Sequence, residues 1–168
     1  LANVKISTLP GAGGLTNNGV AVNANDLISI TDINAGKLKY TPAADANGTG
    51  YASFTFQVQD DGGTLNGGID LDQSPNTITV NVTAVNDAPS GTNKTVTTNE
   101  DTAYTFTAAD FGYSDPIDGA SASGANALAN VKISTLPGAG GLTNNGVAVN
   151  ANDLISITDI NAGKLKYT

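Results

Sequence analysis

The chain has 168 residues, of which 39% are hydrophobic but only 5% aromatic, and its formal net charge is −8. All but one of its fifteen acidic residues are Asp, against seven lysines and no arginine. An acidic surface disfavours nucleic acids and anionic membranes as partners, whereas it suits divalent cations, for which Asp is a compact oxygen ligand. No apolar run approaches the roughly 18 residues that a membrane span requires.

Cys and His are both absent from the sequence. Neither a Ser-His nor a Cys-His nucleophile can therefore be built, and no motif singles out a carboxylate pair of the glycosidase type. We predict that the chain is not an enzyme. An exported domain without disulfides needs another source of stability, and a bound metal ion is one.

Residues 1–41 recur without change as residues 128–168. The period of 127 residues is too long for a solenoid unit and is about the size of one domain. The simplest interpretation is a tandem array of near-identical domains that is cut out of frame. Because the chain starts at Leu1 with neither an initiator Met nor a signal peptide, we expect a fragment of a longer protein.

Short alternating apolar runs, separated by Gly, Asn, Asp and Pro, predict many strands and no helix longer than one turn. About seven strands per period predict an all-β fold, an antiparallel sandwich of two sheets. The turn Asn17-Asn18-Gly19 is typical of a tight hairpin. Leu15 and Val20 flank this turn, and the other expected strands lie, in chain order, around residues 3–7, 28–30, 37–40, 53–59, 77–85, 94–98 and 102–108.

The segment Ala84–Pro89, AVNDAP, separates two apolar runs. Proline fixes φ and cannot continue a strand, so we predict a short, stiff joint here. Residues 1–87 are then a repeat that lacks its N-terminal strands, and residues 88–168 are the following repeat without its C-terminal strands. The alternative is an ordinary turn, since Asn, Asp and Pro are common turn residues.

Strand order also predicts which acidic loops share an end, because antiparallel strands reverse direction at each turn. Five oxygen-bearing residues converge on the joint by this argument: Asp45, Asn86, Asp87, Asp115 and Asp118. Such a cluster favours Ca²⁺, which takes 6–8 oxygen ligands in irregular geometry. The alternative is that each Asp separately shapes a turn. The spacing does not fit an EF-hand, so the predicted site is discontinuous.

Several motifs resemble known repeats. VNDAP (85–89) resembles the linker of cadherins, and FTFQVQDDGG (54–63) with NTITVNV (76–82) resembles their last hairpin. NEDTAYTF, SDPIDG and GKLKYTPAADANGTGYASFTFQVQDDGG resemble the cadherin-like (VCBS-type) tandem repeats of very large bacterial surface adhesins. LPGAGGLTNNGVAV with DINAGKLKYTP is similar to the repeat of chondroitin sulfate proteoglycans (CSPG).

The resemblance implies an antiparallel Ig/cadherin-like β-sandwich repeat with Ca²⁺ at the joints. It places metal ligands at Glu100, Asp115, Asp118, Asp60, Asn86 and Asp87, with Asp45 in a loop that carries acidic ligands in cadherins. Asp61 and Asp101 adjoin two of these positions and complete the candidate set. The linker AVNDAP lacks the leading Asp and the second Asn of cadherins, which implies fewer bound ions.

We therefore expect a Ca²⁺-stabilised spacer or adhesion repeat of a large extracellular bacterial adhesin or surface fibre, of the kind used in biofilms. Its expected partners are neighbouring repeats, and exposed strand edges predict head-to-tail self-association. The alternative is a carbohydrate- or surface-binding module of the same class. A sugar site usually presents exposed aromatic side chains, and the chain has no Trp and only five Tyr.

Overall fold

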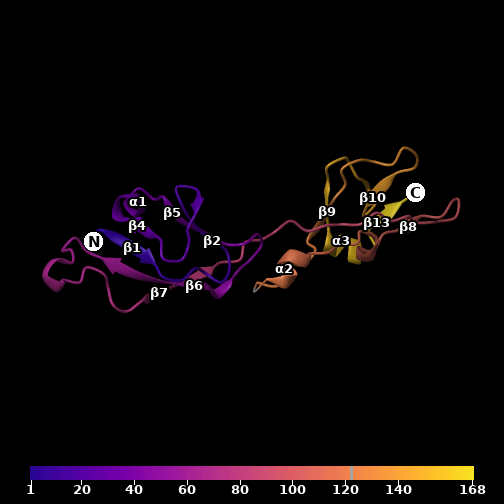
Figure 1. Ribbon diagram of the computed structural model, residues 1–168. Coiled ribbons are helices and arrows are strands. Elements are labelled where there is room, and N and C mark those ends of the chain that lie inside the picture. Colours follow the sequence, from indigo (N-terminus) through magenta and orange to yellow (C-terminus); the bar gives the residue numbers. More distant parts are fainter. Residues whose placement is uncertain (122) are drawn as a thin grey trace. The chain divides into compact units, whose positions relative to one another are not determined.

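The computed structural model describes residues 1–121 and 123–168 and divides into two compact units (Figure 1). Unit 1 comprises Leu1–Val85 with Ser121–Ser123, and unit 2 comprises Asn86–Ala120 with Gly124–Thr168. All strand pairs of the described residues are antiparallel, which confirms the predicted all-β class. No described helix is long and apolar enough to cross a membrane.

Unit 1 contains a four-stranded sheet of order β4-β1-β6-β7 and a three-stranded sheet of order β3-β2-β5. Its short helices are α1 (Ile30–Asn34) and the 3₁₀ helix η1 (Leu65–Gly67). The strands are β1 (Asn3–Ile6), β2 (Gly14–Asn17), β3 (Val20–Ala21), β4 (Leu27–Ser29), β5 (Leu38–Thr41), β6 (Gly48–Gln59) and β7 (Asn76–Val82).

Unit 2 contains a four-stranded sheet of order β11-β10-β13-β8 and a two-stranded sheet of β12 and β9. Its helices are the 3₁₀ helix η2 (Ala108–Asp110), α2 (Pro116–Ala120) and α3 (Ile157–Asn161). The strands are β8 (Tyr104–Thr105), β9 (Asn130–Lys132), β10 (Leu142–Asn144), β11 (Val147–Ala148), β12 (Leu154–Ser156) and β13 (Leu165–Tyr167).

The two identical segments adopt the same strand pattern, as predicted. Val4 pairs with Ile28 in the first copy, and Val131 pairs with Ile155 in the second. Both copies also hold the same ion pair after the short helix, Lys37 to Asp32 and Lys164 to Asp159, each at 2.7 Å. The local sequence therefore determines this part of the fold in two different surroundings.

Each unit has its own apolar core. The core of unit 1 draws buried residues from both of its sheets: Ile6, Leu15, Val22, Ile28 and Phe54. The core of unit 2 contains the buried residues Val149, Ile155, Ile160 and Leu165, with Phe106 and Phe111 packed against them. The repeated segment is thus covered by Phe54 in one unit and by different phenylalanines in the other.

Two details differ from the expected strands. Residues 94–98 are not a strand, and the strand expected over 102–108 is reduced to Tyr104–Thr105. Only one of the five residues in KTVTT is apolar, so this run buries little surface. The helices α1 and α3 exceed the single turn that was expected, because the hydroxyl of Ser29 caps the backbone N–H of Asp32, as that of Ser156 caps Asp159.

Gly13 lies so close to β5 that replacing it tests how the packing there contributes to the stability of unit 1. A Cβ at Gly13 would lie 2.5 Å from the Thr41 carbonyl oxygen, and its φ of +68° is left-handed. We expect Gly13→Ala to destabilise unit 1 by about 2 kcal/mol or more, because a left-handed residue alone costs roughly 1–2 kcal/mol. Urea denaturation measures this loss. Gly14→Ala is the control, since its Cβ would meet nothing within 4 Å, and an equal loss there would contradict the argument.

Candidate functional site

Two carboxylates are buried at the start of unit 2. Asp115 is 8% exposed and Asp118 is 1% exposed, the latter among the most deeply buried side chains described. Asp115 directly precedes α2, whose first residue is Pro116, and its carbonyl oxygen accepts from the Gly119 N–H at 3.0 Å. Proline suits the first helical position, so the sequence SDPIDG sets both carboxylates on one short helical turn.

Asn126 links these carboxylates to the segment Asn86–Asp87. Its side-chain Nδ2 donates to Asn86 Oδ1 at 2.7 Å and to Asp118 Oδ2 at 2.9 Å. Its backbone N–H donates to Asp115 Oδ2 at 2.7 Å. The backbone N–H of Asp87 reaches the same Asp118 oxygen at 3.1 Å. We call Asn86, Asp87, Asp115, Asp118 and Asn126 the unit 2 cluster.

Asp115 and Asp118 have no cationic partner among the residues described. The ion pairs of the described residues lie elsewhere and join Lys37 to Asp32, Lys94 to Asp110 and Lys164 to Asp159. Asp115 Oδ1 is buried and has no hydrogen-bond partner in the described part of the chain. Burying a charge is costly unless it is paired, so the arrangement favours a bound cation.

The pKa of the neighbouring Tyr113 is affected by burial and by the charges of Asp115 and Asp118. Its hydroxyl donates to the Asn126 carbonyl oxygen. Burial raises the pKa of Tyr113, and the nearby charges of Asp115 and Asp118 raise it further. A hollow of about 320 Å³ adjoins these residues; its lining includes Asn86, Asp87, Tyr113, Asp115 and Asn126.

The structure thus brings Asn86, Asp87, Asp115 and Asp118 together within unit 2, as the strand-order argument expected. Asn126 was missed by that argument. Its only signal in the sequence is its position two residues before the repeated segment begins, and no motif marks it. Asp45 belongs to unit 1, where it is exposed in the loop that enters β6 with a φ of 58°.

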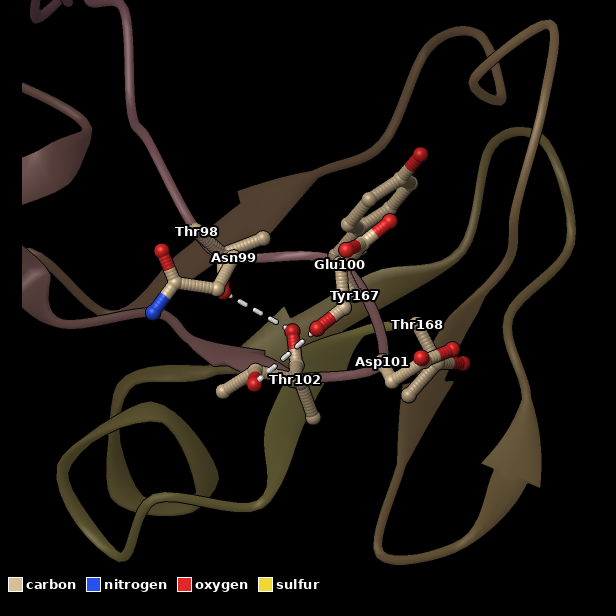
Figure 2. Close-up of a pocket in the computed structure, with 8 residues that line it drawn as sticks. Thr98, Asn99, Glu100, Asp101, Thr102, Tyr167 and Thr168 are labelled. Carbon is tan, nitrogen blue, oxygen red and sulfur yellow. Dashed lines mark hydrogen bonds between the residues drawn. The ribbon is translucent and has the colours of Figure 1, made fainter.

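Glu100 and Asp101 lie elsewhere in unit 2, in the turn before β8. They line a hollow of about 530 Å³ beside Tyr167 and Thr168, and Figure 2 shows these side chains around it. The Thr98 hydroxyl donates to the Thr102 carbonyl oxygen at 2.8 Å and holds the turn. Figure 1 places this turn and α2 at opposite ends of unit 2.

Asp60 and Asp61 lie in unit 1, in the exposed turn that follows β6. Asp60 Oδ1 accepts a hydrogen bond from the Gly62 backbone N–H at 2.8 Å, a local turn contact. In the described residues, no group of three or more acidic side chains is placed to hold a metal ion.

Comparisons with family models, curated proteins and solved structures found no match to this chain. The resemblance to cadherin-like adhesin repeats therefore stays a prediction. The functional argument depends on the residues of the chain itself.

Asp110 contrasts with the cluster, because its buried carboxylate is fully paired. Its Oδ1 lies 2.6 Å from Lys94 Nζ, and its Oδ2 accepts from the Thr107 backbone N–H at 2.8 Å and from the Thr107 hydroxyl at 2.9 Å. The Lys94 hydrogen bond, followed by that of the Thr107 backbone, lowers the pKa of Asp110 to about 2.

This pairing predicts a pH dependence of stability. A lowered folded-state pKa gives stabilisation that is fully present above the unfolded value of about 3.9 and is lost as the pH falls through about 2. We expect Lys94→Met to lower the stability of unit 2 at pH 6, and the difference from wild type to shrink between pH 4 and 2. Urea denaturation across this pH range measures it. A difference that stays constant down to pH 2 would contradict the assignment.

Proposed function

We propose that unit 2 binds Ca²⁺ through Asp115, Asp118 and Asn86. The observation that carries this proposal is the pair of buried carboxylates without a cationic partner among the described residues, one of them with an unpartnered oxygen. Water cannot easily solvate these charges at 8% and 1% exposure. A cation bound there would offset the desolvation cost and satisfy Asp115 Oδ1.

The chemistry of the ligands favours calcium over magnesium. Magnesium requires near-ideal octahedral geometry and keeps several waters, whereas calcium accepts carboxylates, amide oxygens and backbone carbonyls in irregular arrangements. Rotation of the Asn126 amide would exchange its N–H donor for an oxygen acceptor facing Asn86 and Asp118, which would add a ligand. The contributions of Asp87, Asp45, Asp60 and Asp61 stay predictions, whereas Glu100 and Asp101 lie in the turn at the other end of unit 2 and are not ligands of this site.

We infer a structural role for the metal: the chain is a Ca²⁺-stabilised tandem repeat of a large extracellular bacterial adhesin or surface fibre, and not an enzyme. The unaltered repeat of 1–41 as 128–168 supports the tandem array. The core of unit 1, which takes residues from both sheets, supports a β-sandwich of the Ig/cadherin type. A cation bound to α2 and to Asn86–Asp87 would order the segment that follows Val85.

Calorimetric titration of the full chain with CaCl₂ tests the metal site. We expect binding with a dissociation constant of roughly 10⁻⁴ to 10⁻⁵ M, which suffices in an extracellular setting. At a hundredfold excess over that constant, Ca²⁺ should stabilise unit 2 by about 2.7 kcal/mol, and a chelator should reverse this. Asp115→Asn and Asp118→Asn should each abolish both effects, because each removes one of the two buried charges.

Asp101→Asn is the matched control. It changes an acidic residue of the same unit that is exposed, in the turn at the other end, and Asn tolerates its φ of 61°. Binding should be unchanged in this variant. The absence of binding heat in the wild-type chain, or an equal loss in Asp101→Asn, would overturn the proposed site.

A further inference from the structure

One stretch of the repeated segment has the same exposure in both of its copies. From Thr16 to Ile30, and from Thr143 to Ile157, each residue is buried, half-buried or exposed alike in the two copies. The first copy has residues 42–85 beside it in unit 1, and the second has residues 86–120 and 124–127 beside it in unit 2. The exposed residues of this stretch are therefore left uncovered by either neighbouring segment.

Two large apolar side chains of this stretch are exposed. Val20 of β3 is 71% exposed and Leu27 of β4 is 55% exposed, and their equivalents Val147 and Leu154 are 71% and 66% exposed. Val20 and Leu27 line one hollow of about 340 Å³, and their equivalents line a hollow of about 350 Å³ in unit 2. Single exposed apolar residues are common on proteins, whereas apolar residues that adjoin one another around a hollow are typical of an interaction site.

The strands that carry these side chains are edge strands in both units. Among the described strands, β3 pairs only with β2, and β4 pairs only with β1. In the same way, β11 pairs only with β10, and β12 pairs only with β9. A free edge leaves backbone N–H and C=O groups available to another chain. Each hollow thus adjoins two open strand edges as well as two exposed apolar side chains.

A lysine and an aspartate flank the exposed leucine. Lys5 of β1 lies directly opposite Leu27, as Lys132 lies opposite Leu154. Asp26 directly precedes Leu27 and lines the same hollow. The ion pairs of the described residues are formed by other lysines and aspartates. Each copy therefore presents one charge of each sign, without an ion-pair partner among the described residues, beside its apolar side chains.

We propose that this face binds the same face of a second copy of the chain. We call it the β3–β4 patch, and its members are Lys5, Val20, Asp26 and Leu27 in unit 1 and Lys132, Val147, Asp153 and Leu154 in unit 2. Charge complementarity favours this occupant, because a twofold axis beside the leucine brings the lysine of each copy to the aspartate of the other. The apolar side chains of the two copies are then buried between these ion pairs.

The net charge of −8 makes two copies of the chain repel each other at long range. The patch itself is balanced in charge, so it is a place where two copies can meet without repulsion. Each chain carries two patches, and engaging one raises the effective concentration at which the other meets a partner. In the tandem array of the proposed function, every further repeat adds a patch, which supports association of fibres side by side.

Sedimentation of the full chain tests the apolar part of the patch, with a chelator present so that the proposed metal site does not contribute. We expect the wild-type chain to associate as its concentration rises. Leu27→Gln combined with Leu154→Gln should weaken this association at least about tenfold, because the contact loses buried apolar surface. Leu27→Met combined with Leu154→Met keeps that surface and should associate like the wild type.

Leu9→Gln combined with Leu136→Gln is the matched control. These two leucines are equivalent residues of the two copies and are 43% and 47% exposed, but they do not line the hollows. The control should associate like the wild type. Circular dichroism checks that both pairs of substitutions leave the chain folded.

Carbodiimide cross-linking tests the charge pairing, using a mixture of unlabelled and isotopically labelled chains. The reagent joins a lysine amine directly to a carboxylate that it contacts, and mass spectrometry separates links between chains from links within one chain. We expect mixed-isotope links from the patch lysines to Asp26 or Asp153. Asp26→Asn combined with Asp153→Asn should abolish them. Asparagine keeps an oxygen for the backbone N–H of Asn23, which lies 2.7 Å from Asp26 Oδ2, so the turn is retained.

The proposal is overturned if the wild-type chain sediments as a monomer at every concentration, or if Leu27→Gln with Leu154→Gln associates like the wild type. It is also overturned if the Leu9→Gln and Leu136→Gln control loses association to the same extent. Mixed-isotope links that bypass Asp26 and Asp153 would show that the two copies meet through another surface.

Discussion

The structure depends on one constraint: the repeated segment cannot cover itself. It supplies a strand with two hydrogen-bonding edges and a set of apolar residues that its own short strands leave partly exposed. Unpaired backbone groups and apolar surface are both costly, so the segment needs partners from outside. In unit 1 the partner is the β6–β7 hairpin, and in unit 2 it is the segment that contains Phe106 and Phe111.

The sequence predicted the parts of the fold that local patterns specify. Alternation of apolar residues located β6 and β7, and Asn18-Gly19 located the β2–β3 hairpin, with φ values of 51° and 80° at its turn. The apolar pattern of the sequence was a weaker guide where tertiary contacts determine the secondary structure. Lys94 lies in a run that was expected to be a strand on the strength of Val96 alone, yet its ammonium group binds Asp110 and residues 94–98 form no strand. The β-branched residues of ITDIN (30–34) favour a strand, yet the segment is helical because Ser29 caps its first turn.

The candidate site was also predictable only in part. Topology alone placed Asp115 and Asp118 near Asn86 and Asp87, because strand reversal fixes which loops share an end. It could not find Asn126, whose role depends on a backbone N–H and an amide that reach three different residues. Nor could it tell buried from exposed carboxylates. That distinction separates Asp118 at 1% exposure from the exposed Asp101.

Asp110 has the cationic partner that Asp118 lacks among the described residues. Both are buried carboxylates of unit 2, but Asp110 has a lysine at 2.6 Å and two further donors from Thr107, so its charge is stabilised within the unit. Asp118 accepts only neutral N–H donors from Asp87 and Asn126 in the hydrogen bonds described. Neutral donors stabilise a buried charge less than a cation does. Two similar carboxylates of one unit are therefore held differently: Asp110 by a cation, and Asp118 by neutral donors alone in the hydrogen bonds described.

The β6–β7 hairpin and the unit 2 cluster are connected through the chain itself. Strand β7 ends at Val82, and the cluster begins at Asn86, so only Thr83, Ala84 and Val85 separate them. Ordering a residue costs roughly 1–2 kcal/mol of conformational entropy, and a tether this short to a fixed strand removes part of that cost for Asn86 and Asp87. Wherever the hairpin is held in a sheet, the following residues are already restricted when they meet Asp118. Strand pairing and the proposed ion binding would then favour each other without a direct contact, since each reduces the conformational freedom that the other must remove.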